Sequence, residues 1–261
     1  MLKPGFSRRT LLLGATGLAA APVFAQAPDS TTDHRYAVLS IIGDRITLVG
    51  FRKTTGSRLD QNEKRTLTVS GPSIERSTLL SVDDAVKRAL PKPATVLLTG
   101  GDPKLYSLQD APPDKPGDAA EAVEAIKALL QQSQATRLIL VAPYRADARF
   151  PLKQGYIGSG KIAGLGIYVD RVASIQLIET GESAEGFIAP YAYFSVSLID
   201  AKSLATIRRQ AVTESALIAT AEVKTAAEPW DVLSNQKKVE WLEQLVRRGV
   251  DRVMPQLLAG A

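Results

Sequence analysis

The chain has 261 residues, of which 45% are hydrophobic and 23% charged, and it contains no cysteine. This composition is typical of a globular protein, and the lack of cysteine excludes disulfides, thiol nucleophiles, thiolate metal sites and the lipid-anchoring cysteine of a lipoprotein. The formal net charge is +5, and no stretch combines clustered Lys or Arg with stacking aromatics, which argues against nucleic-acid binding.

The N-terminus has the parts of a secretory signal peptide. The first ten residues include the basic residues Lys3, Arg8 and Arg9 and contain no acidic residue. The apolar stretch 11–24 is too short for a membrane-spanning helix, which needs about 20 residues, and Ala25 and Ala27 suit cleavage by signal peptidase after either. We therefore expect a signal peptide over 1–27, a tether over 28–35, and no membrane span after cleavage.

The run Ser7-Arg8-Arg9-Thr10-Leu11-Leu12 resembles the twin-arginine consensus Ser/Thr-Arg-Arg-x-Phe-Leu, with Leu11 in the place of Phe. The resemblance implies that Arg8 and Arg9 are recognised by the twin-arginine (Tat) translocase, and that the mature chain resides in the periplasm. An ordinary secretory signal that contains two arginines is the alternative, and it leads to the same side of the membrane. Removing the signal leaves 29 basic against 27 acidic residues, a net charge of +2.

The first half of the mature chain alternates apolar strands with amphipathic helices. Two apolar runs, 36–42 and 45–51, flank the turn-forming pair Gly43-Asp44 and predict a β-hairpin. Further along, the pattern predicts strands over 66–70, 94–99 and 137–142 and helices over 72–90 and 118–134. Because the strands 94–99 and 137–142 are apolar throughout, we expect crossover connections and a sheet covered by helices.

The second half is richer in strands. The pattern predicts strands over 166–174, 175–179, 192–199 and 205–213, with a turn at 200–203, and an amphipathic helix over 234–258. The expected fold is a single α/β or α+β domain over 36–261. It has a mixed sheet with packed helices, a β-rich extension at about 155–215 and a C-terminal amphipathic helix.

The predicted hairpin from Tyr193 to Ala205 turns through Leu198-Ile199-Asp200-Ala201-Lys202-Ser203. It resembles a hairpin of bacterial envelope domains, in which a strand ending in Leu-Val/Ile-Asp-x-x-[Ser/Thr/Gly] turns into its partner after a helix and a strand. Those domains are the curli-secretion lipoprotein and the amino-terminal domain of the Tol propeller protein. The preceding helix and strand resemble 119–142 here, although the glycine usual in the turn is absent. The resemblance implies a non-catalytic α/β envelope domain and carries over no site residues.

A glycine-rich segment carries the spacing of a phosphate-binding loop. Gly155-Tyr156-Ile157-Gly158-Ser159-Gly160-Lys161 fits G-x-x-x-x-G-K, but Ile162 stands where Ser or Thr would hold Mg²⁺, and no helix is predicted after it. We interpret the segment as a surface loop. The sole histidine, His34, falls in the predicted tether, so we expect neither a metal site nor a cofactor.

Four residues are candidate contacts for a ligand or partner. Tyr144 and Arg145 follow the buried strand 137–142, at the position where α/β folds place their sites, and Tyr156 and Lys161 lie in the glycine-rich segment. The structural alternative is that such side chains cap the sheet. The nearby aromatics either line a core face or form an exposed interaction patch: Tyr168, Phe187, Tyr191, Tyr193 and Phe194.

Together these patterns favour a non-enzymatic envelope domain that binds an unknown envelope protein or small ligand. The alternative is a periplasmic hydrolase that uses carboxylates near strand ends with the help of Arg145. Its candidate acids are Asp102, Asp147, Asp170 and Asp200. No particular catalytic residue is predicted.

Overall fold

The computed structural model describes residues 34–43, 45–52, 62–68, 73–100, 104–106, 120–176, 183–219 and 222–260. The predicted signal peptide, with Arg8 and Arg9, and most of the predicted tether lie outside these residues. Residues Asp33–Ala261 form one compact unit. No helix of the described part is both long and apolar enough to cross a membrane.

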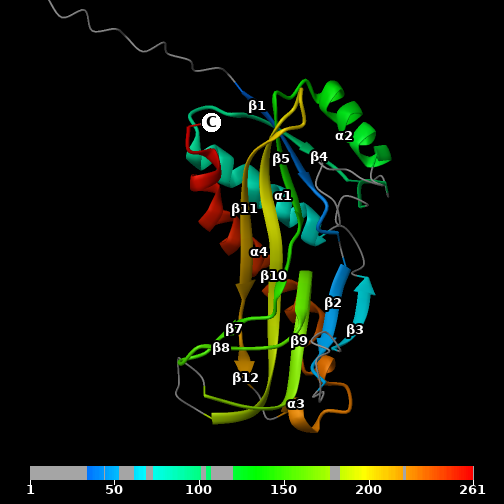
Figure 1. The fold of residues 1–261 in the computed structure, drawn as a ribbon, viewed down its shortest axis with the longest axis vertical. Coiled ribbons are helices and arrows are strands. Elements are labelled where there is room, and N and C mark those ends of the chain that lie inside the picture. The colour runs from blue at the N-terminus through cyan, green and yellow to red at the C-terminus, as the bar shows by residue number, and fades with distance from the viewer. Residues whose placement is uncertain are drawn as a thin grey trace, which may run out of the picture. The chain divides into compact units, whose positions relative to one another are not determined.

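The described residues form a mixed sheet with helices packed on it, which confirms the predicted fold class (Figure 1). The strands are β1 (Arg35–Ser40), β2 (Arg45–Gly50), β3 (Glu63–Thr68), β4 (Ala94–Leu98), β5 (Arg137–Pro143), β6 (Arg145–Asp147), β7 (Phe150–Pro151), β8 (Tyr156–Ile157), β9 (Lys161–Gln176), β10 (Ser183–Asp200), β11 (Thr206–Ser215) and β12 (Ile218–Ala219). The helices are α1 (Ser73–Ala89), α2 (Ala120–Ser133), α3 (Glu222–Thr225), the 3₁₀ segment η3 (Pro229–Val232) and α4 (Asn235–Leu258). The amphipathic C-terminal helix is therefore confirmed as α4.

The long strand β10 is shared by two half-sheets. Its residues 194–200 pair with β5, whose other neighbour is β1, and β1 in turn pairs with β4. Its residues 183–193 pair with β9, which leads on to β2 and β3. The predicted strand 166–174 and the first two residues of the predicted strand 175–179 belong to the single strand β9, and 177–179 lie outside the described residues. The segment 155–215, expected as a β-rich extension, supplies β9, β10 and β11 and so includes the strand common to both half-sheets.

The predicted β-hairpin over 36–51 is wrong. β1 lies parallel to β5 and β2 lies parallel to β9, and β5 and β9 both run antiparallel to β10. The strands β1 and β2 therefore run in the same direction, one in each half-sheet. The residues between them make a lateral step, in which Gly43 has a φ of +74°, a conformation that glycine adopts without strain. The hairpin of β10 and β11 around 200–203 is confirmed.

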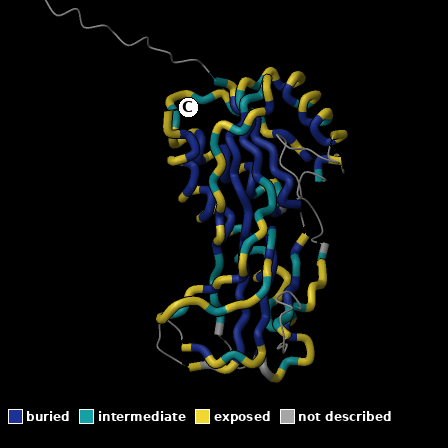
Figure 2. The backbone as a smooth tube through the Cα atoms, viewed as in Figure 1, coloured by how far each residue is buried: buried dark blue, intermediate teal, exposed yellow. Residues whose placement is uncertain are grey.

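Helices cover one face of the sheet along both half-sheets. Side chains of α1 and α4 form one core with alternate residues of the strands, including Val38 of β1 and Phe194 of β10, and α3 and η3 extend this core over the second half-sheet, where Leu48 of β2 belongs to it. The opposite face has two separate cores. Helix α2 covers the first half-sheet through Ile126 and Leu130. On this face, the second half-sheet is covered by a β-hairpin. Figure 2 shows the central strands as buried along most of their length.

A β-hairpin of residues 145–163, which we call the arm, covers the second half-sheet. Its base pairs β6 with the start of β9, and its outer part pairs β7 with β8. The Phe150 ring is fully buried, with its centroid 4.9 Å from that of Tyr168 and 6.0 Å from that of Phe187. Aromatic packing therefore holds the arm on the sheet. The glycine-rich segment interpreted as a surface loop is part of this arm.

Charged side chains attach α4 to the edge strand β11. The carboxylate of Glu214 on β11 is buried, and both Arg248 and Arg252 of α4 pair with it. At the end of α4, the Arg208 guanidinium donates to the carbonyls of Leu257 and Ala259, which have no partner within the helix. These contacts position α4 across the sheet.

We predict that Phe150→Ala destabilises the protein by about 3 kcal/mol, because it removes a buried ring from an aromatic cluster. The control is Tyr156→Ala in the same arm, where the side chain is 69% exposed and we expect a change within about 0.5 kcal/mol. Urea unfolding followed by circular dichroism measures both. Equal destabilisation by the two substitutions would contradict this account of the arm.

Candidate functional site

A small cleft of about 280 Å³ opens where the two half-sheets meet. It is lined by residues of the β1–β2 step, the neighbouring strand β3, the end of β5, the base of the arm and the start of β9: Ile42, Arg45, Thr47, Thr66, Pro143, Arg145, Ala163, Gly164 and Leu165. Four of these nine side chains are polar. The described lining contains no acidic residue.

The sheet topology explains the position of the cleft. The parallel strands β1 and β5 end here, and β2 and β9 begin here, so the neighbour of β10 on this side changes from β5 to β9, while β11 continues on its other side. Ligands of open α/β sheets bind outside the carboxyl ends of parallel strands, where neighbouring connections diverge. The cleft occupies this position relative to β1 and β5.

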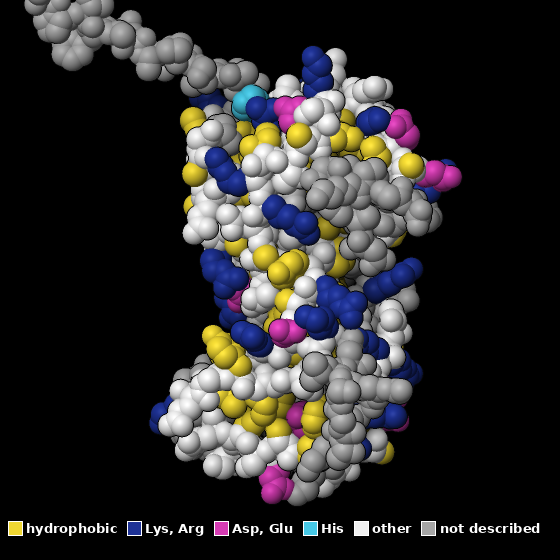
Figure 3. Space-filling view, viewed as in Figure 1, with side chains coloured by type: hydrophobic (Ala, Val, Ile, Leu, Met, Phe, Trp, Pro, Cys, Tyr) yellow, Lys and Arg dark blue, Asp and Glu magenta, His cyan; other side chains and the backbone are white. Residues whose placement is uncertain are grey.

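Two arginines line the cleft. Arg45 begins β2 and Arg145 begins β6, and both side chains are exposed to solvent. Among the described residues, no carboxylate forms an ion pair with Arg45. Figure 3 shows Lys and Arg side chains gathered across the middle of the visible face, with few acids among them. The positive charge of Arg45 therefore favours an anion over a cation at the cleft.

A buried tyrosine hydroxyl lies next to the cleft wall. Tyr191 of β10 is fully buried, and its ring crosses over Gly166 towards Thr47 of β2, the residue that pairs with Gly166. A Cβ atom at position 166 would lie 2.3 Å from the Tyr191 hydroxyl, so only glycine leaves room for this ring. Burial, with a contribution from Tyr193, raises the pKa of the Tyr191 phenol, and the Thr47 side chain opposes this shift. Tyr191 is therefore a neutral hydrogen-bond donor.

The four predicted contact residues lie in different places. Arg145 lines the cleft, and the half-buried Tyr144 donates its backbone N–H to the carbonyl of Tyr193 beside it. Lys161 at the base of the arm pairs with Asp147 at 2.9 Å. Tyr156 lies near the tip of the arm and is exposed. The structure thus brings only Arg145, with Tyr144 adjacent, to the cleft.

The glycine-rich segment does not form a phosphate-binding loop. The Lys161 ammonium group donates a hydrogen bond to Asp147, and this bond lowers the pKa of the Asp147 carboxyl. The residues after Lys161 continue as β9 instead of forming a helix, so no helix N-terminus faces the segment. The other aromatics of this region, Tyr168, Phe187, Tyr193 and Phe194, are buried, as the core interpretation expected.

The predicted carboxylates do not converge. Asp147 belongs to the arm, and Asp170 accepts from the backbone N–H groups of Val172 and Ala173 at a bend of β9. Asp170 lies opposite Phe187 of β10, and Asp200 ends that strand, so the two carboxylates are about 40 Å apart at the usual rise of a strand. Asp102 lies outside the described residues. Within the described part, no three His, Asp or Glu side chains group closely enough to hold a metal.

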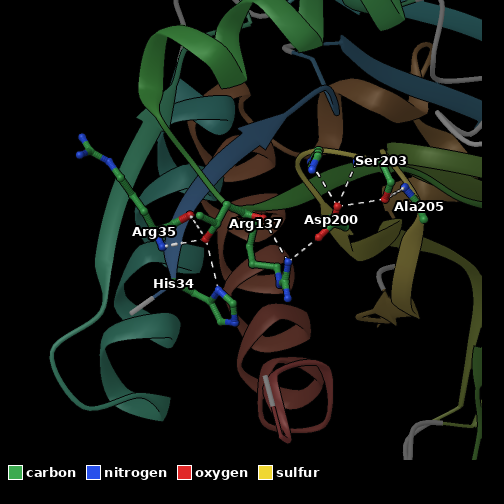
Figure 4. Close-up of polar contacts among 8 residues, drawn as sticks. His34, Arg35, Arg137, Asp200, Ser203 and Ala205 are labelled. Atoms are coloured by element: carbon green, nitrogen blue, oxygen red, sulfur yellow. Dashed lines mark hydrogen bonds and ion pairs between the residues drawn. The ribbon is translucent and has the colours of Figure 1, made fainter. Parts of the chain in front are cut away.

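His34 joins a polar cluster at the outer end of the first half-sheet, although the sequence placed it in the tether (Figure 4). Its Nδ1 lies 3.3 Å from the hydroxyl of Thr136. Asp200 accepts from Arg137 at 2.6 Å and from the Ser203 hydroxyl at 2.9 Å. Because Asp200 contacts the serine directly, and the histidine contacts Thr136, the cluster lacks the base-to-nucleophile contact of a catalytic triad. It locks the turn between β10 and β11.

Sequence reasoning missed Arg45, Thr47 and Thr66 as site residues. The hairpin predicted for β1 and β2 places Arg45 at the first position after a tight turn, where a solvated arginine needs no explanation. Its proximity to Arg145, a hundred residues later in the chain, depends on the pairing of β2 with β9 and of β6 with β9. The alternation of Arg45 and Thr47 on one face of β2 is the only local signal.

No family model matches the chain, and no curated protein is similar to it in sequence. The chain shows a weak likeness to three solved structures: a Xanthomonas campestris protein of the DUF330 family, a PelC dodecamer from Paraburkholderia phytofirmans, and a putative neuraminyllactose-binding hemagglutinin homolog from Helicobacter pylori. Their identities to this chain are 9%, 12% and 9%, and their TM-scores are 0.35, 0.32 and 0.31. The alignments cover 87%, 87% and 88% of this chain, and 84%, 88% and 81% of the respective structures. At these values the likeness carries no functional argument.

We predict that Asp200→Asn destabilises the protein by about 1 kcal/mol at pH 7, because it weakens hydrogen bonds to a charged group. The Ser203 backbone N–H and hydroxyl and the charge of Arg137 hold the pKa of Asp200 below its ordinary value. This contribution is present above the unfolded-state pKa of about 3.9 and is lost as the pH falls through the folded-state pKa. Urea unfolding at pH 7 and pH 3.5 should show the difference shrinking in acid. A constant difference would contradict the assignment.

Proposed function

We propose that the mature chain is an exported, non-enzymatic binding domain of the bacterial periplasm, and that it binds an anionic group in the cleft between Arg45 and Arg145. The observation that carries the proposal is that two arginines, from separate strands, line one small cleft whose described lining has no acid. Charge-assisted hydrogen bonds from arginine are the usual means by which proteins hold carboxylate and phosphate groups.

The size of the cleft favours a small ligand or the charged end of a larger one. Ligand pockets for drug-sized molecules occupy about 300–1,000 Å³, and this cleft of about 280 Å³ lies at the lower limit. The carboxylates at Asp147, Asp170 and Asp200 each have a structural partner, which gives the hydrolase alternative no support in the described residues. Binding without chemistry is therefore the simpler proposal.

Export rests on the N-terminal sequence. The basic residues, the apolar stretch 11–24 and the run Ser7-Arg8-Arg9-Thr10-Leu11-Leu12 support a twin-arginine signal, with cleavage after Ala25 or Ala27. A cysteine-free chain that forms one compact unit needs no oxidising compartment to fold. Folding before export, as the twin-arginine route requires, is compatible with this composition.

We predict that Arg45→Gln and Arg145→Gln each weaken anion binding by about tenfold or more, because each removes a charged donor from the cleft. Isothermal titration of the mature chain with glycerol 3-phosphate and with succinate at low ionic strength measures this, and added salt should weaken binding further. Lys202→Gln removes the same charge from the exposed turn between β10 and β11 and serves as the matched control. Equal affinity in all four proteins would refute the cleft as the site.

We also predict that a reporter fused to residues 1–30 reaches the periplasm through the twin-arginine pathway. Replacing Arg8 and Arg9 together by Lys should abolish export, because the consensus requires both arginines, while the positive charge of the n-region is preserved. Fractionation of the reporter between periplasm and cytoplasm gives the answer. Unchanged export of the double variant would assign the signal to the ordinary secretory route.

A further inference from the structure

The polar side chains that line the cleft come from three strands. Arg45 and Thr47 lie on one face of β2, Thr66 lies opposite Thr47 on β3, and Arg145 begins β6 in the arm. A carboxylate presents its two oxygens in one plane, and a single arginine fork satisfies it. Donors distributed around a cavity instead fit a group whose oxygens point in several directions. A tetrahedral oxyanion has this shape.

The buried hydroxyl of Tyr191 provides a second, independent observation. Its side chain is fully buried, and among the described residues no hydrogen-bond partner satisfies its Oη atom. Leaving such a buried donor unsatisfied costs about 1–3 kcal/mol. A Cβ atom at position 166 would lie 2.3 Å from both the Tyr191 hydroxyl and the backbone oxygen of Thr47, so the hydroxyl lies beside Thr47, which itself lines the cleft. Thr47 therefore stands between the buried donor and the cleft.

We propose that the cleft selects the phosphate group of a phosphate ester, with the Tyr191 hydroxyl donating to Oγ1 of Thr47 and the Thr47 hydroxyl donating to a phosphate oxygen. Arg45 and Arg145 neutralise the charge, and Thr66 supplies a further donor. Tyr191 acts through Thr47 and is a positioning residue. This inference rests on the proposed function, since it specifies the ligand class of the same cleft.

The direction of this hydrogen-bond chain follows from the chemistry of the two side chains. A phenol that stays neutral can donate, and a threonine hydroxyl that accepts one hydrogen bond still has its own hydrogen to donate. A bound phosphate oxygen orients the Thr47 hydroxyl as a donor, which leaves Oγ1 of Thr47 directed to accept from Tyr191. Chains of hydrogen bonds strengthen one another in a region of low dielectric constant. The gain is larger for an anion than for a neutral ligand.

The cleft has room for more than a bare phosphate ion, whereas a large ligand would have to extend beyond it. Its lining also includes the half-buried apolar residues Pro143 and Ala163, which suit a short carbon chain next to the phosphate. A phosphate ester of this kind comes either from a soluble metabolite or from a lipid head group. The chemistry of recognition is the same for both sources.

The test compares two ligands of similar charge and two ligand sources. Titration calorimetry on the mature chain uses glycerol 3-phosphate against succinate, and flotation uses phosphatidylcholine vesicles with and without phosphatidylglycerol. The variants are Tyr191→Phe, which preserves the ring, and Thr47→Val, which preserves the side-chain shape. Tyr168→Phe is the matched control, because its hydroxyl contacts Ser159 in the arm, away from the cleft lining.

We expect Tyr191→Phe and Thr47→Val to weaken phosphate-ester binding about tenfold while succinate binding changes less than twofold, so the selectivity ratio falls. Tyr168→Phe should leave that ratio unchanged. In the absence of ligand, the unfolding temperature of Tyr191→Phe should not decrease, because in that state the substitution removes a buried donor that no described residue satisfies. A merely structural role of Tyr191 would move stability and both affinities together, which would overturn the inference.

The other possible outcomes also distinguish between the two proposals. If Arg145→Gln weakens both ligands but Tyr191→Phe and Thr47→Val weaken neither, the phosphate selectivity is wrong and the anion-binding function stands. If neither soluble ligand nor vesicles bind, both proposals fall. Binding of phosphatidylglycerol vesicles that depends on Tyr191 supports a lipid source, and binding of the soluble ester alone supports a metabolite. Vesicle binding that is unchanged by Tyr191→Phe would overturn the inference.

Discussion

The backbone hydrogen bonds of β10 are the interaction on which both half-sheets depend. One part of this strand pairs with β5 and the other with β9, so a single continuous strand sets the register of both. Because successive side chains of a strand point to opposite faces, Phe194 packs beneath α4 while its neighbour Tyr193 packs beneath the arm. A break in β10 would separate the helical face and the arm-covered face at once.

The cleft is a consequence of this arrangement. Since β5 and β9 occupy successive parts of the same side of β10, one strand must end where the other begins, and the chain steps sideways between β1 and β2. Side chains at such a step, among them Arg45 and Arg145, are not covered by a neighbouring strand. The close approach of Tyr191 to Gly166 brings a buried donor to the same place. Topology thus concentrates polar groups at one position without any sequence motif.

Local pattern predicted the helices because amphipathic spacing reports which face of a helix is buried. The helices expected over 72–90, 118–134 and 234–258 correspond to α1, α2 and α4 with small differences at their ends. The prediction of a β-hairpin around Gly43-Asp44 is wrong because a tight turn and a sideways step of the chain use the same residue types. The two possibilities differ only in which distant strands pair with β1 and β2, and nothing within ten residues encodes that choice. For the site, sequence reasoning found Arg145 from its place after a buried strand.

The sequence by itself determined the fold class, the buried faces of the main helices and the position of Arg145 at a strand end, because burial leaves a periodic trace in the residues that undergo it. The tertiary structure alone decided that Arg45 and Thr66 lie near Arg145, that Tyr191 lies behind Thr47, and that the glycine-rich segment is part of a packed arm. These are relations between strands far apart in the chain. They arise from non-local backbone pairing and side-chain packing, which no local pattern of residues specifies.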